Sequence, residues 1–221
     1  LKKELAGGGS VDDAALKVAR KAFKETSAIR FEGNGYSEAW VKEAKKRGLL
    51  NLRRAPEALA QLTTKDAKAL FKGTGILSEA ELESRYHIRV ERYVKDLLIE
   101  METLAEMLDT MILPAAYSYL GELAEGAAKT KAVGIKSIPQ KAALASVGKL
   151  VTALQGKTAA LHTAIHKAHT LHNDISKCAA FLTSTGASTM LACREISDKL
   201  EVSVGDAHWP LPRYREMLFP V

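Results

Sequence analysis

The sequence predicts an all-α protein. Ala, Leu, Lys and Glu are abundant, aromatic residues make up only 6% of the 221 residues, and no sustained run of alternating β-branched residues occurs. This balance favours helix over strand. A helical rhythm of apolar residues continues from residue 78 to 123, and a proline-containing apolar segment ends the chain. We therefore expect a long kinked helix in an up-down helical bundle, preceded by short helices and loops and followed by an extended, docked C-terminal tail.

The segment over residues 78–123 is the one around which we expect the rest to pack. Ser78, with Glu81 three residues later, predicts a capping box at its start. Apolar side chains then recur every three or four residues, the spacing of one helix face: Leu82, Tyr86, Val90, Tyr93, Leu97, Met101, Leu104, Leu108, Met111 and Ala115. Pro114 lacks a backbone donor. It predicts a kink at residues 109–113 and not an end, because apolar residues continue beyond it.

Residues 1–77 predict a linker, one helix, and a region of short helices and loops. Ser10 is expected to cap a helix that ends near residue 28. The expected buried face of that helix is Val11, Ala14, Ala15, Val18, Ala22 and Phe23. Further helices are expected after Ser37, ending at Gly48, and from Pro56. A last short helix is expected from Thr63 or Thr64 to Gly73 or Gly75.

Residues 78–221 predict a helical bundle with a docked tail. The glycine-punctuated stretch 121–136 predicts a loop or a frayed helix end. A second long helix is expected to begin at Ser137 and Pro139 and to keep its apolar face as far as Leu182, with a third helix after Gly186. Short connections favour antiparallel packing of these helices on the first.

The tail carries six bulky apolar side chains within eleven residues: Trp209, Leu211, Tyr214, Met217, Leu218 and Phe219. Exposed together they would form an adhesive patch, so we expect the segment to be docked. Pro210 and Pro212 favour an extended path. We expect Arg213 and Arg215 to face solvent or the carboxylates of the long helix.

Composition argues against several classes of protein. The net charge is +6 and the pI is about 9.2, yet basic residues are interleaved with acidic ones and clustered aromatics are missing, so we expect no nucleic-acid partner.

Cys178 and Cys193 do not have the spacing of a disulfide framework and are expected to be reduced and inert. No apolar run reaches the roughly eighteen residues of a membrane span, and the N-terminus has no apolar segment typical of a signal peptide, so we expect a cytoplasmic protein. The start at Leu1, without Met, is typical of a fragment of something longer.

Four histidines are the densest set of chemically active side chains. His162, His166 and His169 share one helix face at i, i+4 and i+7, and His172 follows. This spacing can place imidazoles on a metal ion. The alternative is that they are polar residues on a solvent face, because no Asp or Glu lies among them before Asp174. The sequence leaves open whether they bind anything.

Other candidate sites are incomplete. Glu100, Glu102 and Glu106 have no histidine on the same turn, as a di-iron helix would require. The turn 33–35 is not a phosphate-binding glycine motif, and Cys193 has no histidine close in sequence. We therefore expect no catalytic, cofactor-binding or metal-binding residue in this chain.

Three ordered segments resemble one enzyme family. They are Phe31-Glu32-Gly33-Asn34-Gly35-Tyr36-Ser37 with Glu38-Ala39-Trp40 and residues 43–52, then Met111-Ile112-Leu113-Pro114-Ala115-Ala116, and finally residues 209–219, WPLPRYREMLF. Together they are similar to the C-terminal region of type III glutamine synthetases. Because they keep the family's order and span residues 31–219, the resemblance covers nearly the whole chain.

The resemblance implies an ATP-dependent ligase that joins ammonia to glutamate through a γ-glutamyl phosphate, works as a dodecamer and uses Mg²⁺ or Mn²⁺. It also implies that the catalytic residues precede Leu1, so that this chain supplies structure and subunit contacts. Residues 1–77 would then end the catalytic part and residues 78–221 would form the C-terminal bundle. A second hypothesis is a detached, non-catalytic scaffold or accessory subunit of a larger complex. The lysine-rich later helices and the histidines, which are not features of the family, favour that hypothesis.

Overall fold

A computed structural model describes residues 6, 8, 10–136 and 138–218 of the chain. All regular structure in these residues is helical, which confirms the predicted all-α class. The chain divides into two compact units, Leu1–Arg53 and Arg54–Val221. The division lies earlier than the boundary after residue 77 that the sequence suggested, because the short helices after Arg54 pack onto the long helix. Within the described ranges, no helix is both long and apolar enough to cross a membrane.

In its described residues the first unit contains two α-helices and a 3₁₀ turn: α2 (Val11–Glu25), η1 (Ser27–Ile29) and α3 (Glu38–Lys46). Both predicted caps are confirmed, because the Ser10 hydroxyl accepts from the N–H of Asp13 and the Ser37 hydroxyl from the N–H of Trp40. Gly48, with φ of +75°, ends the second helix as predicted.

The predicted buried face of α2 is wrong. Of its six apolar residues only Ala14 is buried, while Val11 and Phe23 are among the most exposed large side chains. The helix is amphipathic, and the Arg30 guanidinium lies over the Phe23 ring at 3.4 Å from its centroid, yet Phe23 stays 63% exposed. Burial depends on a partner and not on the pattern alone.

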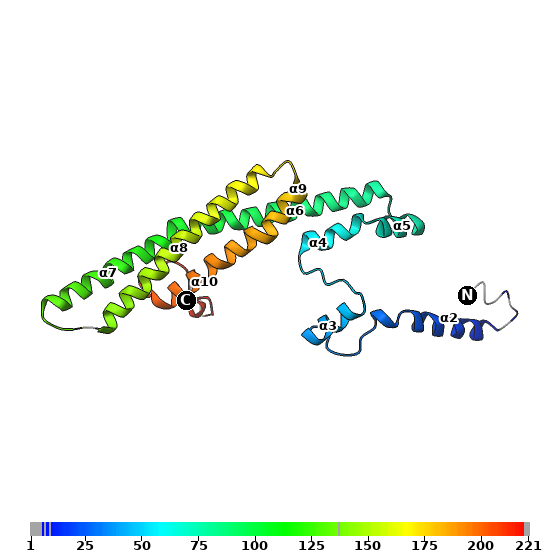
Figure 1. The fold of residues 1–221 in the computed structure, drawn as a ribbon, viewed down its shortest axis with the longest axis horizontal. Coiled ribbons are helices and arrows are strands. Elements are labelled where there is room, and N and C mark those ends of the chain that lie inside the picture. Colours follow the sequence, from blue (N-terminus) through cyan, green and yellow to red (C-terminus); the bar gives the residue numbers. More distant parts are fainter. Residues whose placement is uncertain (1–5, 7, 9, 137, 219–221) are drawn as a thin grey trace. The chain divides into compact units, whose positions relative to one another are not determined.

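The second unit holds the remaining helices (Figure 1). They are α4 (Ala55–Ala60), η2 (Gln61–Thr63), α5 (Lys65–Thr74), α6 (Glu79–Met107), η3 (Leu108–Ile112), α7 (Leu113–Ala132), α8 (Ile138–Thr170), α9 (Ile175–Phe181), η4 (Leu182–Gly186), α10 (Ala187–Ser203) and α11 (Tyr214–Leu218). Pro56 lies at the start of α4, Thr64 caps α5, and Gly75 ends α5 with a positive φ, all as predicted.

The predicted long helix is confirmed and is longer than the sequence suggested. It runs through α6, η3 and α7 for 54 residues, about 80 Å at 1.5 Å per residue. Ser78 and Glu81 form the predicted capping box. At the position of the predicted kink, before Pro114, the structure has the π-helical turn η3, after which the N–H of Leu113 donates to the carbonyl of Leu108. A π-helical turn is one way for a helix to accommodate a missing backbone donor.

A loop or a frayed helix end was predicted over residues 121–136, and the loop is wrong for most of this stretch, because α7 continues to Ala132. Gly126 in this stretch marks a close approach between helices and not a break. A Cβ there would lie 3.0 Å from the side-chain nitrogen of Gln140 on α8. Ser137, the predicted start of the second long helix, lies outside the described residues.

The second long helix was predicted to reach Leu182, and this is wrong. α8 ends at Thr170, and the chain reverses over residues 171–174. Asp174 then caps α9 by accepting from the N–H of Lys177 at 3.0 Å. The predicted third helix does follow Gly186, because α10 begins at Ala187, but it continues from α9 through the π-helical turn η4, in which Gly186 is buried. A Cβ at Gly186 would lie 3.0 Å from Sδ of Met101, so the glycine allows η4 to approach α6.

Antiparallel packing of α8 on α6–α7 and of α10 on α8 confirms the predicted up-down bundle (Figure 1). The largest fully buried side chains come from α6, η3, α8, α9, η4 and α10. They include Leu82, Met101, Leu108, Leu154, Leu161, Leu182 and Leu200.

The prediction of a docked tail is confirmed at the start of the tail, but it is wrong for the last described residues, which are exposed. Trp209 is 8% exposed and belongs to the core, but Met217 is 60% exposed and Leu218 53%. The prolines are followed by the short helix α11. Arg213 does not reach the long helix; its Nε lies 2.8 Å from Oδ1 of Asp206. Phe219 and the side chains of Tyr214 and Arg215 lie outside the described part of the structure.

Candidate functional site

Two of the predicted histidines pair with carboxylates of the long helix. Nε2 of His162 lies 2.8 Å from Oδ2 of Asp109, and Nε2 of His169 lies 2.8 Å from Oε1 of Glu102. All four side chains are roughly half exposed. We call this set the histidine seam. The sequence analysis found no carboxylate near the histidines because these carboxylates come from a helix more than fifty residues away.

The seam follows from the antiparallel register of two helices. His162 and His169 are two turns apart on α8, and Glu102 and Asp109 are two turns apart on α6–η3. His166 and Glu106 occupy the intermediate turn, and no hydrogen bond or ion pair joins them in the described coordinates. His162 and His169 are exposed, as the solvent-face interpretation expected, but each has a carboxylate partner on the neighbouring helix, whereas His166 has none among the described residues. His162 and His169 therefore link the helices.

A metal centre has no support in this arrangement. In the part of the chain that the structure describes, no group of three or more His, Cys, Asp or Glu side chains could hold a metal ion. Nδ1 of His172 lies 2.8 Å from the carbonyl of His169, so it belongs to the turn that ends α8. What the seam can do chemically is form hydrogen bonds or ion pairs across a helix interface.

A third pair joins the tail to α7. Nε2 of His208 lies 3.1 Å from Oε2 of Glu122, and its ring centroid lies 5.5 Å from that of Tyr119. This pair fixes the segment that leads to the buried Trp209. It was not predicted, because His208 and Glu122 are far apart in sequence.

The two cysteines are buried and free. Burial raises the pKa of the Cys178 thiol, and burial likewise raises that of Cys193 although Lys157 opposes it. A raised pKa leaves little thiolate near neutral pH, so neither thiol is activated as a nucleophile.

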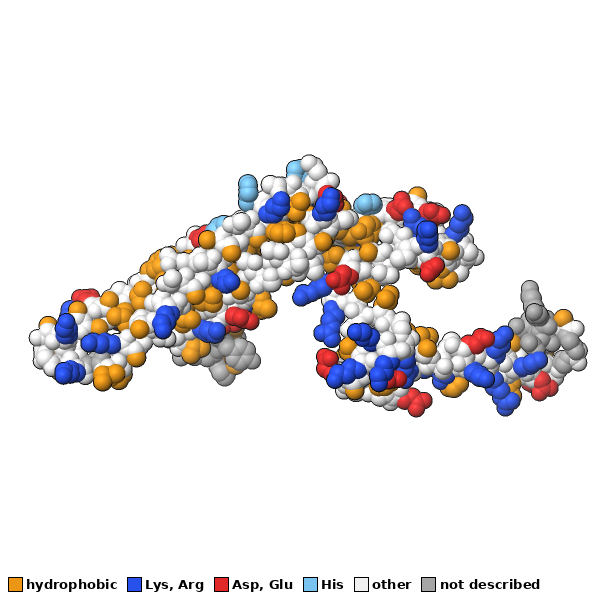
Figure 2. All heavy atoms as spheres, in the orientation of Figure 1, with side chains coloured by type: hydrophobic (Ala, Val, Ile, Leu, Met, Phe, Trp, Pro, Cys, Tyr) orange, Lys and Arg blue, Asp and Glu red, His pale blue; other side chains and the backbone are white. Residues whose placement is uncertain are grey.

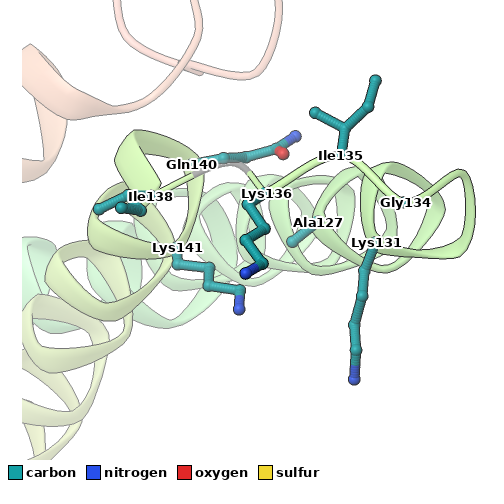
Figure 3. A pocket seen from close by; sticks show the side chains of 8 residues that line it. All are labelled: Ala127, Lys131, Gly134, Ile135, Lys136, Ile138, Gln140 and Lys141. Atoms are coloured by element: carbon teal, nitrogen blue, oxygen red, sulfur yellow. The ribbon is translucent and has the colours of Figure 1, made fainter.

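The connection between α7 and α8 surrounds a shallow cavity of about 380 Å³ (Figure 3). Its lining residues are Ala127, Lys131, Gly134, Ile135, Lys136, Ile138, Gln140 and Lys141. In Figure 3 the ammonium groups of Lys131, Lys136 and Lys141 extend toward one side of the connection, whereas Ile135 extends toward the other. Val133, Ile135 and Ile138 are 72%, 60% and 77% exposed. We call residues 129–141 the hairpin tip.

Charge is strongly segregated along the bundle, contrary to the interleaving expected from composition. Residues 96–128 contain seven Asp and Glu and no Lys or Arg, whereas residues 126–173 contain seven Lys and no Asp or Glu. Figure 2 shows Lys side chains gathered over the end of the bundle where α7 and α8 meet. This separation of charges can be read from the sequence, but the net charge of the whole chain does not reveal it.

The remaining candidate is the glycine turn at residues 33–35. It closes through the N–H of Tyr36, which donates to Oδ1 of Asn34 at 3.0 Å, and neither glycine has a positive φ. The N–H of Ser37 donates to the Asn34 carbonyl, so the turn serves to start α3.

Comparison with known proteins identifies the class of this chain. The family described as "Glutamine synthetase C-terminal domain" matches residues 14–131, more than half of the sequence. The chain belongs to this family, as the resemblance predicted.

Named relatives agree with this assignment. A "Glutamine synthetase" of Bacteroides fragilis (strain YCH46) is 31% identical over 214 residues, which cover 94% of this chain and 29% of the relative. A "Type-3 glutamine synthetase" of Dictyostelium discoideum is 33% identical, over 92% of this chain and 28% of the relative. A "Glutamine synthetase" of Butyrivibrio fibrisolvens is 27% identical, over 96% and 30%. The chain thus spans less than a third of the length of the relatives it matches.

Proposed function

We propose that this chain is the C-terminal portion of a type III glutamine synthetase, a cytoplasmic, oligomeric enzyme that joins ammonia to glutamate at the expense of ATP. In this proposal the chain supplies structure and subunit contacts. The catalytic residues, the ATP site and the Mg²⁺ or Mn²⁺ sites belong to the remainder of the enzyme.

The extent of the match carries the proposal. Similarity to glutamine synthetases runs through 92–96% of this chain, so both units and the whole bundle have counterparts in those relatives. Because the match covers less than a third of each relative, most of the enzyme's length is left for the catalytic region.

The structure supports a role in subunit contacts. Ile88 and Ile99 are exposed on α6, and Val11 and Phe23 are exposed on α2. Large apolar side chains that gather on a surface are commonly covered by another chain or domain. A helix of 54 residues also offers an extended platform for such contacts.

The mass of the native polypeptide tests the proposal against its alternative. Intact-mass spectrometry of the protein from its source should give more than three times the 24.0 kDa of this chain. A native mass near 24.0 kDa would contradict the proposal and favour a detached scaffold or accessory subunit.

A further inference from the structure

We propose that the hairpin tip of one copy docks on the outward face of α6 in a second copy of this chain. The receiving surface is Ile99, Glu100 and Glu106, which we call the acidic patch. The inference deepens the proposed role in subunit contacts and rests on it, because it names the partner and the surfaces that meet.

The hairpin tip combines unpaired cations with exposed aliphatic groups. Lys131, Lys136 and Lys141 have no ion-pair partner among the described residues, whereas Lys129 pairs with Glu125. The three exposed aliphatic side chains of the tip, Val133, Ile135 and Ile138, have 60% or more of their surface in contact with solvent. A surface of this composition is complemented by one that is both acidic and apolar.

The acidic patch has the complementary composition. Ile99 is 61% exposed, and Glu100 and Glu106 are exposed without an ion-pair partner in the described coordinates. Val94 and Met101 face the core, and Ile99 and Glu106, seven residues apart, lie on the opposite side of the helix. Glu100 lies on the flank of this outward face. Glu102 is excluded from the patch because it pairs with His169.

The two surfaces cannot meet within one chain. They lie on one continuous helix and its connection, and Glu106 precedes Lys131 by twenty-five residues, about 37 Å along the axis. A second copy whose long helix runs antiparallel to the first places each tip on the acidic patch of the other. One two-fold axis then generates two identical contacts, which is the commonest symmetry of protein dimers.

Other anionic partners explain only half of these observations. An anionic membrane or a nucleic acid would bind the Lys residues of the tip, but it would leave Glu100 and Glu106 uncompensated. A second copy of the chain accounts for both sets of charges, and for the exposed aliphatic residues within each set. Charge complementarity therefore favours self-association.

A charge-swap experiment on the full-length protein tests the inference. The tip variant carries Lys131→Glu, Lys136→Glu and Lys141→Glu, and the patch variant carries Glu100→Lys and Glu106→Lys. A matched control carries Lys42→Glu, Lys45→Glu and Lys46→Glu on α3, with the same change of charge as the tip variant. Circular dichroism checks that each variant keeps its helical content, and light scattering after size-exclusion chromatography gives the assembly mass.

We expect the tip variant and the patch variant each to fall to half the wild-type mass or less. An equimolar mixture of the two should regain the wild-type mass, because the acidic tip of one then meets the basic patch of the other. The α3 control should keep the wild-type mass.

Three outcomes would overturn the inference. The first is a tip variant at wild-type mass. The second is a mixture that fails to reassemble. The third is sedimentation of the wild-type protein, but not the tip variant, with phosphatidylserine vesicles while both have the same mass, which would assign the tip to a membrane surface. Glutamine synthesis by the wild-type protein is measured alongside. If the wild-type protein forms no glutamine, the proposed function is contradicted. If it forms glutamine but the tip variant keeps the wild-type mass, only the docking is contradicted.

Discussion

His162 and Asp109 join the middle of α8 to the π-helical turn η3, with Nε2 and Oδ2 2.8 Å apart. The contact lies beside the turn that Pro114 follows, so it ties α8 to the point where the long helix departs from regular hydrogen bonding. The pair of His169 and Glu102 repeats the link two turns away. His162 and His169 thus connect α8 to the long helix.

The seam should contribute measurably but little to stability. Both pairs are about half exposed, and ion pairs or hydrogen bonds at such sites typically contribute about 0.2–1 kcal/mol. His169→Gln, Glu102→Gln and the double variant should show a coupling energy in this range when unfolding is followed in urea at pH 6. The coupling should shrink in 1 M salt, where charges are screened.

His166→Gln is the matched control for that cycle, since His166 shares the helix face but has no partner in the described coordinates. We expect it to change the free energy of unfolding by no more than about 0.5 kcal/mol. A coupling energy of zero between His169 and Glu102 would show that their contact contributes nothing.

Trp209 should be the most sensitive position of the tail. Because its indole is buried in the core, Trp209→Ala should lower the free energy of unfolding by about 3 kcal/mol or more. Met217→Ala changes a side chain that is 60% exposed and should cost less than about 0.5 kcal/mol. Chemical denaturation of both variants measures the difference, and equal costs would mean that the tail is not docked at Trp209.

The capping box makes part of the stability depend on pH. The backbone N–H and the hydroxyl of Ser78 lower the pKa of Glu81 below its ordinary value of 4.5. Because the pKa is lower in the folded state, this contribution is present above pH 4.5 and is lost as the pH falls through the folded pKa. Glu81→Gln should therefore lose less stability than the wild type between about pH 5 and about pH 3.

Glu195→Gln, at an exposed position of α10 outside any cap, is the control for that titration. It should follow the wild-type curve. If Glu81→Gln also follows the wild-type curve, the carboxylate does not stabilise the start of α6.

The thiols should resist modification in the folded chain. Burial raises the pKa of Cys178 and of Cys193, and the folded bundle covers both sulfur atoms. At pH 8, iodoacetamide should label neither residue on the timescale that labels both in denaturant, as read by peptide mass spectrometry. Rapid labelling of either cysteine in the native protein would show that its part of the core opens.

Features with local signals could be predicted from the sequence. The caps at Ser10, Ser37 and Ser78 depend on residues three positions apart. Pro114 itself indicates that the regular hydrogen bonding of the long helix changes nearby, where the π-helical turn η3 lies. The turn at Asp174 carried a similar cap signal, but the apolar pattern continued across it and hid the reversal.

Features that depend on a partner could not be predicted in this way. Most of the apolar face of α2 is exposed, and the sequence pattern alone does not show whether a partner covers it. The histidine seam depends on the register of α8 against α6, which no local pattern specifies. The close approach of Gly186 to Met101 exists only in the folded bundle, so the sequence did not predict it.

The most direct test of the central claim is formation of glutamine from glutamate, ammonia and ATP by the full-length protein, compared with residues 1–221 alone. We predict that the full-length protein forms glutamine and that the isolated chain does not. Glutamine formation by residues 1–221 alone, or none by the full-length protein, would contradict the account.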